Sequence, residues 1–207
     1  MLISMIILGV LGLMVIVGLG RPILKDFRVN WIAALAFFAL VIGLNFIPLI
    51  TIGNFTFSVG TALFYLTAFV MFFVYGKFST QMTAMALGLI LGGLIYAATR
   101  LSLLGGNAFF ANTNYVYALV LGTITFLVTR NGKYSFLSAA IAMLLANLLV
   151  QIGSPIGLNY GFDWTLVACG TAFTMYALAR LAIDVMEKRT GRKSKLAHMF
   201  EADRLED

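Results

Sequence analysis

The chain has 207 residues, of which 61% are hydrophobic and only 11% are charged. A soluble domain averages roughly 25% charged residues, and a core in so short a chain cannot take up this much apolar surface, so the composition excludes an ordinary soluble globular protein. The net charge is +6, but the basic residues lie beside hydrophobic runs, which indicates membrane orientation rather than nucleic-acid binding. We therefore expect an integral membrane protein with much of its apolar surface facing lipid.

Seven apolar segments follow one another along the sequence, and we predict that each is a transmembrane helix of an all-α, polytopic bundle. A helix that rises about 1.5 Å per residue needs about 20 residues to cross about 30 Å of hydrocarbon, and most of the segments qualify. The segments are residues 2–20, 31–50, 58–76, 82–104, 115–128, 136–153 and 164–183. The fifth is short, but it can extend back through the uncharged stretch FFANTN.

Basic residues are distributed among the connections as seven crossings predict. They lie after the first, third, fifth and seventh segments: Arg21, Lys25 and Arg28, then Lys77, then Arg130 and Lys133, then a cluster in the tail. The connections after the second, fourth and sixth segments contain no Lys or Arg. The positive-inside rule therefore places the N-terminus outside and the C-terminus in the cytoplasm, and six or eight crossings would break the pattern.

The composition changes near residue 185, which divides the chain into two parts. Residues 1–184 are predicted to form the seven-helix transmembrane domain, and residues 185–207 a charged cytoplasmic tail that is partly helical. The basic cluster of the tail consists of Lys188, Arg189, Arg192, Lys193 and Lys195. Two interpretations stay open: the basic half of the tail meets anionic headgroups, or the tail is a docking helix for a cytoplasmic protein.

The fourth segment carries the most regular pattern. Small or polar residues recur every four positions, which places them along one stripe of a helix; they are Ala84, Gly88, Gly92, Tyr96 and Arg100. Gly88 and Gly92 form a GxxxG motif, and small residues let membrane helices approach closely. We expect Ala84, Gly88 and Gly92 to form a helix-packing face, which also turns Arg100 away from lipid.

A charged side chain within an apolar segment is costly unless it is paired or reaches the headgroups. Arg100 is predicted to lie near the outer end of its helix, and among the acidic residues Asp163 is the one predicted on the same side. We therefore predict an Arg100–Asp163 pair that joins the outer ends of the fourth and seventh segments. The alternatives are contacts with backbone carbonyls, snorkelling to headgroups, and an anion-binding role for Arg100.

Further polar side chains collect in the same outer half of the predicted bundle. Asn147 and Gln151 are four residues apart on the sixth segment, and Asn45 lies near the end of the second. Hydrogen bonding between helices explains them. The alternative is an outward-facing polar pocket in which they bind a ligand together with Arg100, Tyr96 and Asp163.

The sequence lacks the residue groups that catalysis or metal binding would need. One cysteine, Cys169, and one histidine, His198, cannot form an ordinary zinc or haem site, and there is neither an HExxH motif nor a glycine-rich phosphate loop. We therefore expect no catalytic residues, no metal and no cofactor, and predict that the protein is not an enzyme.

Two functions from different classes fit these features. The first is a non-catalytic scaffold, assembly or regulatory subunit of a membrane complex. The second is a small-solute transporter, or the membrane substrate-binding component of one, with a polar pocket around Arg100. We expect the protein in a bacterial cytoplasmic membrane, where small seven-segment proteins of this character occur. The expected partners are the bilayer, anionic headgroups at the cytoplasmic face, and a protein partner or a second copy, and not nucleic acid.

Overall fold

Each of the seven apolar segments contains one helix, and the all-α class predicted from the sequence is confirmed. The computed structural model describes residues 2–18, 24, 29–53, 55–75, 78–100, 115–153 and 162–191. In these ranges the helices are α1 (Leu2–Val17), α3 (Trp31–Leu44), α4 (Val59–Tyr75), α5 (Phe78–Arg100), α7 (Tyr115–Thr129), α8 (Gly132–Gly153) and α9 (Phe162–Thr190).

Short polar side chains mark where several of these helices begin. Asn30 precedes α3, and its side chain accepts a hydrogen bond from the Ile32 N–H at 3.2 Å. Ser58 and Asn131 accept in the same way from N–H groups three residues further on, at the starts of α4 and α8. Each cap satisfies a backbone donor that the first turn of a helix leaves free, so the caps fix where the apolar runs become helical.

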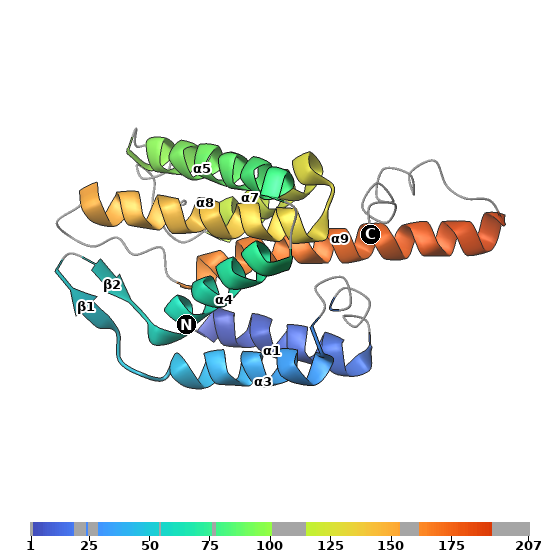
Figure 1. Ribbon diagram of the computed structural model, residues 1–207, viewed down its shortest axis with the longest axis horizontal. Helices are drawn as coiled ribbons and strands as arrows, with labels where there is room; N and C mark the ends of the chain where they lie inside the picture. The colour runs from blue at the N-terminus through green and yellow to red at the C-terminus, as the bar shows by residue number, and fades with distance from the viewer. Residues whose placement is uncertain are drawn as a thin grey trace.

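The helices form two groups, with α8 at the centre of the larger one. α8 packs against α5, α7 and α9, and α7 also packs along α9. The other group consists of α1, α3 and α4, and α1 joins it to α9. In Figure 1 the helices run back and forth along the long axis, and the last turns of α9 project beyond the other helices.

A β-hairpin lies where the sequence predicts the end of a helix and a loop. The second apolar segment was expected to be helical to residue 50, but α3 ends at Leu44, and β1 (Ile50–Ile52) pairs antiparallel with β2 (Phe55–Phe57). Ile52 pairs with Phe55, so two residues connect the strands, and Gly53 has a φ of 61°. Glycine adopts this left-handed conformation without strain, which lets the chain reverse after so few residues.

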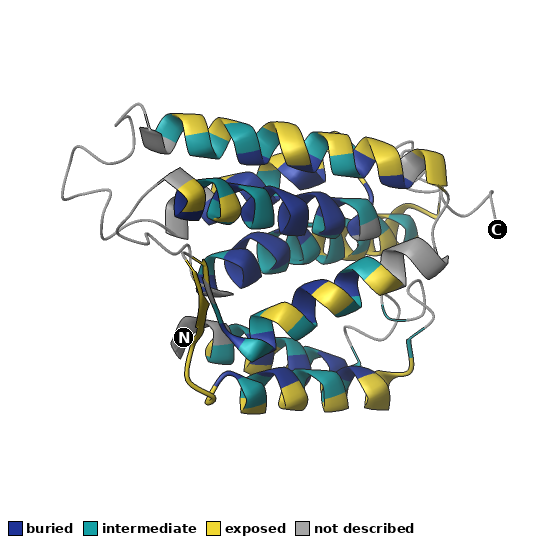
Figure 2. Ribbon diagram, turned by 60° about the vertical axis from the view of Figure 1, so that its left-hand side comes forward, coloured by how far each residue is buried: buried dark blue, intermediate teal, exposed yellow. Residues whose placement is uncertain are grey.

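The exterior of the bundle is apolar. Large hydrophobic side chains are exposed on every described helix, such as Leu13 on α1, Leu66 on α4 and Ile90 on α5, and Figure 2 shows exposed positions on the outward sides of the helices. A soluble monomer rarely exposes so much contiguous apolar surface. The described surface is therefore compatible with a membrane protein.

Three of the described helices are long and apolar enough to span a bilayer. Their spanning windows are Gln81–Ala98 in α5, Tyr134–Ile152 in α8 and Asp163–Thr190 in α9. The remaining helices are apolar but shorter: α3, with 14 residues, is about 21 Å long. The stretch FFANTN, by which the fifth segment was expected to lengthen, lies outside the described residues.

Candidate functional site

The stripe predicted on the fourth segment lies on α5, and its small residues face α8. The Ser138 hydroxyl of α8 donates a hydrogen bond to the carbonyl oxygen of Ala84 at 2.9 Å. A Cβ atom at Gly88 would lie 2.8 Å from the Cβ of Ile141, and one at Gly92 would lie 2.6 Å from the Ala142 carbonyl oxygen. Both glycines thus occupy positions where the two backbones leave no room for a side chain.

The charged end of the stripe is only partly described. Arg100 is the last residue of α5, and its side chain lies outside the described residues. Tyr96, one turn earlier, is half-buried. The predicted pair stays a prediction.

Asp163 has a structural explanation that does not involve Arg100. It lies in the first turn of α9 and is only 8% exposed. The N-terminus of a helix carries a partial positive charge and free N–H groups, which favour a carboxylate at this place. The structure therefore accounts for a buried acid at residue 163 whether or not an arginine faces it.

The two amides predicted on the sixth segment are joined to each other. Gln151 is buried, and its Nε2 donates to Asn147 Oδ1 at 3.2 Å, one turn back along α8. Both residues have further interactions within the structure. They therefore satisfy part of their hydrogen-bonding capacity locally, and a role in ligand binding stays a prediction.

Asn45 belongs to a separate buried polar cluster at the end of α3. The Ser58 hydroxyl donates to Asn45 Oδ1 at 2.8 Å and lies 2.5 Å from the Thr61 hydroxyl. A Cβ atom at Gly60 would lie 2.6 Å from Asn45 Oδ1, so glycine is needed for this approach. Asn45 Nδ2 is buried without a hydrogen-bond partner among the described residues. The cluster ties the end of α3 to the start of α4.

A second buried hydrogen bond, which the sequence does not reveal, connects the two helix groups. The hydroxyl of Tyr65 on α4 lies 2.8 Å from the hydroxyl of Thr165 on α9, and both residues are buried. A tyrosine and a threonine in separate apolar segments give no pattern from which this contact could have been predicted.

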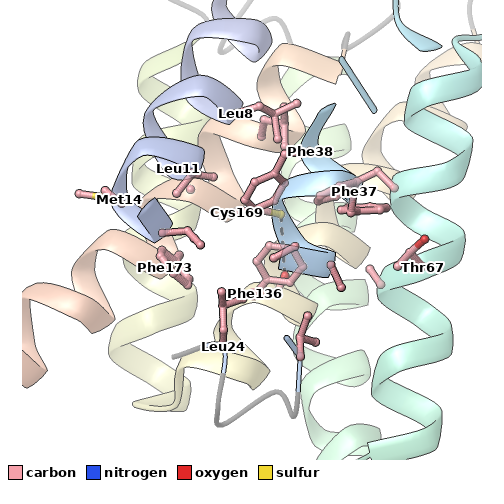
Figure 3. Close-up of a pocket in the computed structure, with 18 residues that line it drawn as sticks. Leu8, Leu11, Met14, Leu24, Phe37, Phe38, Thr67, Phe136, Cys169 and Phe173 are labelled. Carbon is pink, nitrogen blue, oxygen red and sulfur yellow. Dashed lines mark hydrogen bonds between the residues drawn. The ribbon is translucent and has the colours of Figure 1, made fainter. Parts of the chain in front are cut away.

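Another feature that the sequence does not reveal is an apolar cavity between the two helix groups (Figure 3). Its volume is about 320 Å³. Five helices and the segment before α3 supply its lining, which consists of Leu8, Leu11, Met14, Val15, Leu24, Val29, Ala33, Ala34, Phe37, Phe38, Phe64, Thr67, Ala68, Phe136, Leu166, Cys169, Gly170 and Phe173. The ring centroids of Phe37 and Phe38 lie 6.3 Å apart, and the rings are tilted by 53° to each other.

The lining of this cavity offers little to a polar molecule. Thr67 and Cys169 are its polar side chains, and the Cys169 thiol already points to the carbonyl oxygen of Phe136 at 3.9 Å. A polar molecule that entered would lose hydrogen bonds to water without gaining partners from the walls, so the cavity is suited to an apolar occupant.

The end of α9 carries the described part of the basic tail. Lys188 and Arg189 are exposed in its last turn, whereas Arg192, Lys193 and Lys195 lie outside the described residues. The described ranges contain no group of three His, Cys, Asp or Glu side chains that could hold a metal ion. The candidate sites are therefore the polar positions above, the cavity and the exposed end of α9.

Comparison with known protein families, with curated proteins and with solved structures found no match.

Proposed function

We propose that the protein is a non-catalytic subunit of a membrane complex, which crosses the bilayer seven times and docks a cytoplasmic partner with the end of α9. The observation that carries this proposal is the length of α9. With 29 residues it is about 43 Å long, whereas the hydrocarbon core is about 30 Å thick. A helix of this length extends into the headgroups or beyond them.

The projecting turns of α9 have the character of an interaction surface. Asp184, Val185, Met186, Lys188 and Arg189 are all exposed there, so apolar and charged side chains lie together on a stretch of helix that projects beyond the other described helices (Figure 1). Basic residues dominate from 188 to 195, with five Lys or Arg and no acidic residue. The partner that fits is a protein with an acidic surface, since opposite charges steer and orient such contacts.

The proposed topology has its N-terminus outside and its C-terminus in the cytoplasm. It is supported by the alternating directions of successive helices in Figure 1, where the hairpin lies at one end and the last turn of α9 at the other. The shorter helices need flanking residues or local thinning of the bilayer to cross. Cysteine mapping tests the topology: in a Cys169→Ala background, Thr51→Cys should react with an impermeant reagent on intact cells, and Gly191→Cys only after permeabilisation. The reverse pattern, or labelling of both from one side, would contradict the topology.

The docking function is tested on the full chain in native lipid nanodiscs. A stoichiometric complex should be visible by mass measurement, with cross-links to residues 184–190. The double variant Lys188→Glu/Arg189→Glu should reduce complex formation about tenfold, and rising salt should weaken the wild-type complex. The matched control, Lys188→Arg/Arg189→Lys, keeps both charges and should retain the partner. A chain that stays without a stoichiometric partner would contradict the docking function, and a complex unaffected by charge reversal would show that the basic end of α9 does not hold the partner.

The solute-carrier alternative has its support in the buried polar residues Gln151 and Asp163. It requires a solute held by the purified protein and released on Arg100→Ala. Retention of the solute by that variant, or the absence of any solute, would leave the docking function as the sole candidate.

A further inference from the structure

The apolar cavity between the helix groups provides an inference that is independent of the docking function of α9. Figure 3 shows side chains from α1, α3, α4, α8 and α9 around one space, with Cys169 among the aromatic rings. A volume of about 320 Å³ lies within the range of known small-molecule pockets, roughly 300–1,000 Å³.

The walls of the cavity decide which chemistry can occupy it. A buried water needs two to four polar partners, and a polar solute loses hydrogen bonds when it enters an apolar site. The lining residues are aliphatic or aromatic apart from Thr67 and Cys169. Water and polar solutes are therefore unsuitable occupants of the cavity, whereas a hydrocarbon is a suitable one.

The cavity is open to the exterior of the bundle. Several lining side chains are only half-buried, among them Leu11, Met14 and Phe173. Leu13 on α1 and Leu178 on α9 are more than half exposed, so both helices also present apolar side chains to the exterior. In a bilayer, the molecules that reach such an opening are lipid chains.

The cavity extends along the helix axes. Its lining includes Leu8 to Val15 on α1 and Leu166 to Phe173 on α9, and each of these stretches rises about 10 Å. An extended chain lying parallel to the helices has the same direction as the chains of the surrounding bilayer.

We propose that this cavity binds a single hydrocarbon chain of a membrane lipid. Ala34 and Ala68 make room for the chain, and the rings of Phe37, Phe38 and Phe136 line it. The ligand class is thus an acyl chain, supplied by a phospholipid or by a free fatty acid. The inference requires that the protein resides in a membrane, but it does not require a protein partner at α9.

Native mass spectrometry of the full chain, released from lipid nanodiscs, tests the proposal. The wild type should retain one lipid adduct under conditions that strip the loosely bound lipids, and the adduct mass distinguishes a phospholipid from a fatty acid. Ala34→Phe fills the cavity and should reduce the adduct about tenfold. The control is Ala39→Phe, because Ala39 is exposed on the same helix and does not line the cavity; it should keep the adduct.

A second measurement uses the wild type alone, so it stands even if Ala34→Phe does not fold. A phospholipid and a fatty acid that each carry a diazirine in the chain are photolysed with the protein in nanodiscs. Labelling should be at least about fivefold greater at Met14 than at Leu13, and at Phe173 than at Leu178, and excess unlabelled lipid should remove it. Saturable labelling by either probe supports the site and identifies the source of the chain.

Three results would overturn the proposal. One is even labelling of lining and outward residues, which would indicate general contact with the bilayer. Another is an adduct that Ala34→Phe retains as well as Ala39→Phe. The third is a dimer without bound lipid, in which a second copy covers the opening.

Discussion

The two sides of the central helices differ in how closely their neighbours approach. On one side, α5 lies against α8 so closely that Gly88 and Gly92 have no room for a Cβ atom. On the other side, a cavity of about 320 Å³, lined in part by aromatic side chains of α3 and α8, lies between the larger helix group and α1, α3 and α4. Residue size therefore decides how closely these helices pack, because lipid gives apolar helices no hydrophobic reason to associate.

A similar close contact joins α7 to α9. A Cβ atom at Gly122 would collide with the carbonyl oxygen of Ala168 and lie 2.8 Å from the Cβ of Thr171. By contrast, Gly170, which lines the cavity, has only Ile7 Cγ2 at 3.5 Å as a neighbour of such an atom. Some glycines of this protein therefore permit close contact between two helices, whereas Gly170 borders the cavity. Three substitution experiments can distinguish the tightly packed contacts from the loosely packed region around the cavity.

The largest effect is expected for Gly92→Leu at the α5–α8 contact. The new side chain must push the Ala142 carbonyl and Leu145 away, and overpacking of this kind costs about 3 kcal/mol. For a chain of this size the thermal midpoint should fall by roughly 6–12 °C, which is measured by unfolding in detergent.

Gly93→Leu is the matched control for that experiment. It lies on the same helix one residue away, and a Cβ atom there meets nothing within 4 Å among the described residues. Its midpoint should stay within about 2 °C of the wild type, because leucine also favours the helix more than glycine does. Equal losses from Gly92→Leu and Gly93→Leu would show that the α5–α8 contact is not tight.

The sequence predicts those features of the fold that depend on residues close to one another along the chain. Helices follow from the length and hydropathy of each apolar run, and the stripe on α5 follows from helical spacing alone. The hairpin was missed although its signal is present: the alternation of ITI and FTF around Gly53 and Asn54 is typical of two strands with a two-residue turn. Its lack of Lys and Arg predicts only a connection on the outer side between two helices.

The cavity could not be predicted in the same way. Phe37 and Phe38 have the same hydropathy whether they face lipid or another helix, so their position depends on packing between distant segments. The same holds for the Tyr65–Thr165 hydrogen bond, whose partners are 100 residues apart. The prediction that Asp163 pairs with Arg100 rests on elimination among the acidic residues. That procedure does not consider that the N-terminus of a helix can by itself favour a carboxylate at residue 163.

An intermediate effect is expected where a hydrogen bond, rather than close packing, joins the two helix groups. Tyr65→Phe and Thr165→Val each remove one partner of the contact between α4 and α9. In a double-mutant cycle their coupling should be about 0.6 kcal/mol, and at most about 1.7 kcal/mol, as for other hydrogen bonds between membrane helices. Unfolding free energies of the four proteins in detergent measure it.

Thr171→Val provides the control for the cycle. Its hydroxyl donates to the Val167 carbonyl of its own helix at 2.7 Å, so its combination with Tyr65→Phe should be additive within about 0.3–0.5 kcal/mol. A coupling of Tyr65 to Thr165 that is no larger than this would mean that the hydroxyl pair does not hold the helix groups together.

The smallest effect on stability is expected for Gly170→Ala, which tests the loosely packed region beside the cavity. The methyl group meets only ordinary contact with Ile7, and alanine favours a helix over glycine by about 1 kcal/mol at most. The unfolding free energy should therefore stay the same or rise by a few tenths of a kcal/mol, since α1 can accommodate the methyl group. Gly122→Ala makes the same chemical change at the α7–α9 contact and should lower stability instead, because a backbone carbonyl occupies the place of the methyl group. If both substitutions lowered stability equally, α1 would lie as close to α9 as α7 does, and the cavity beside Gly170 would be too narrow for a lipid chain.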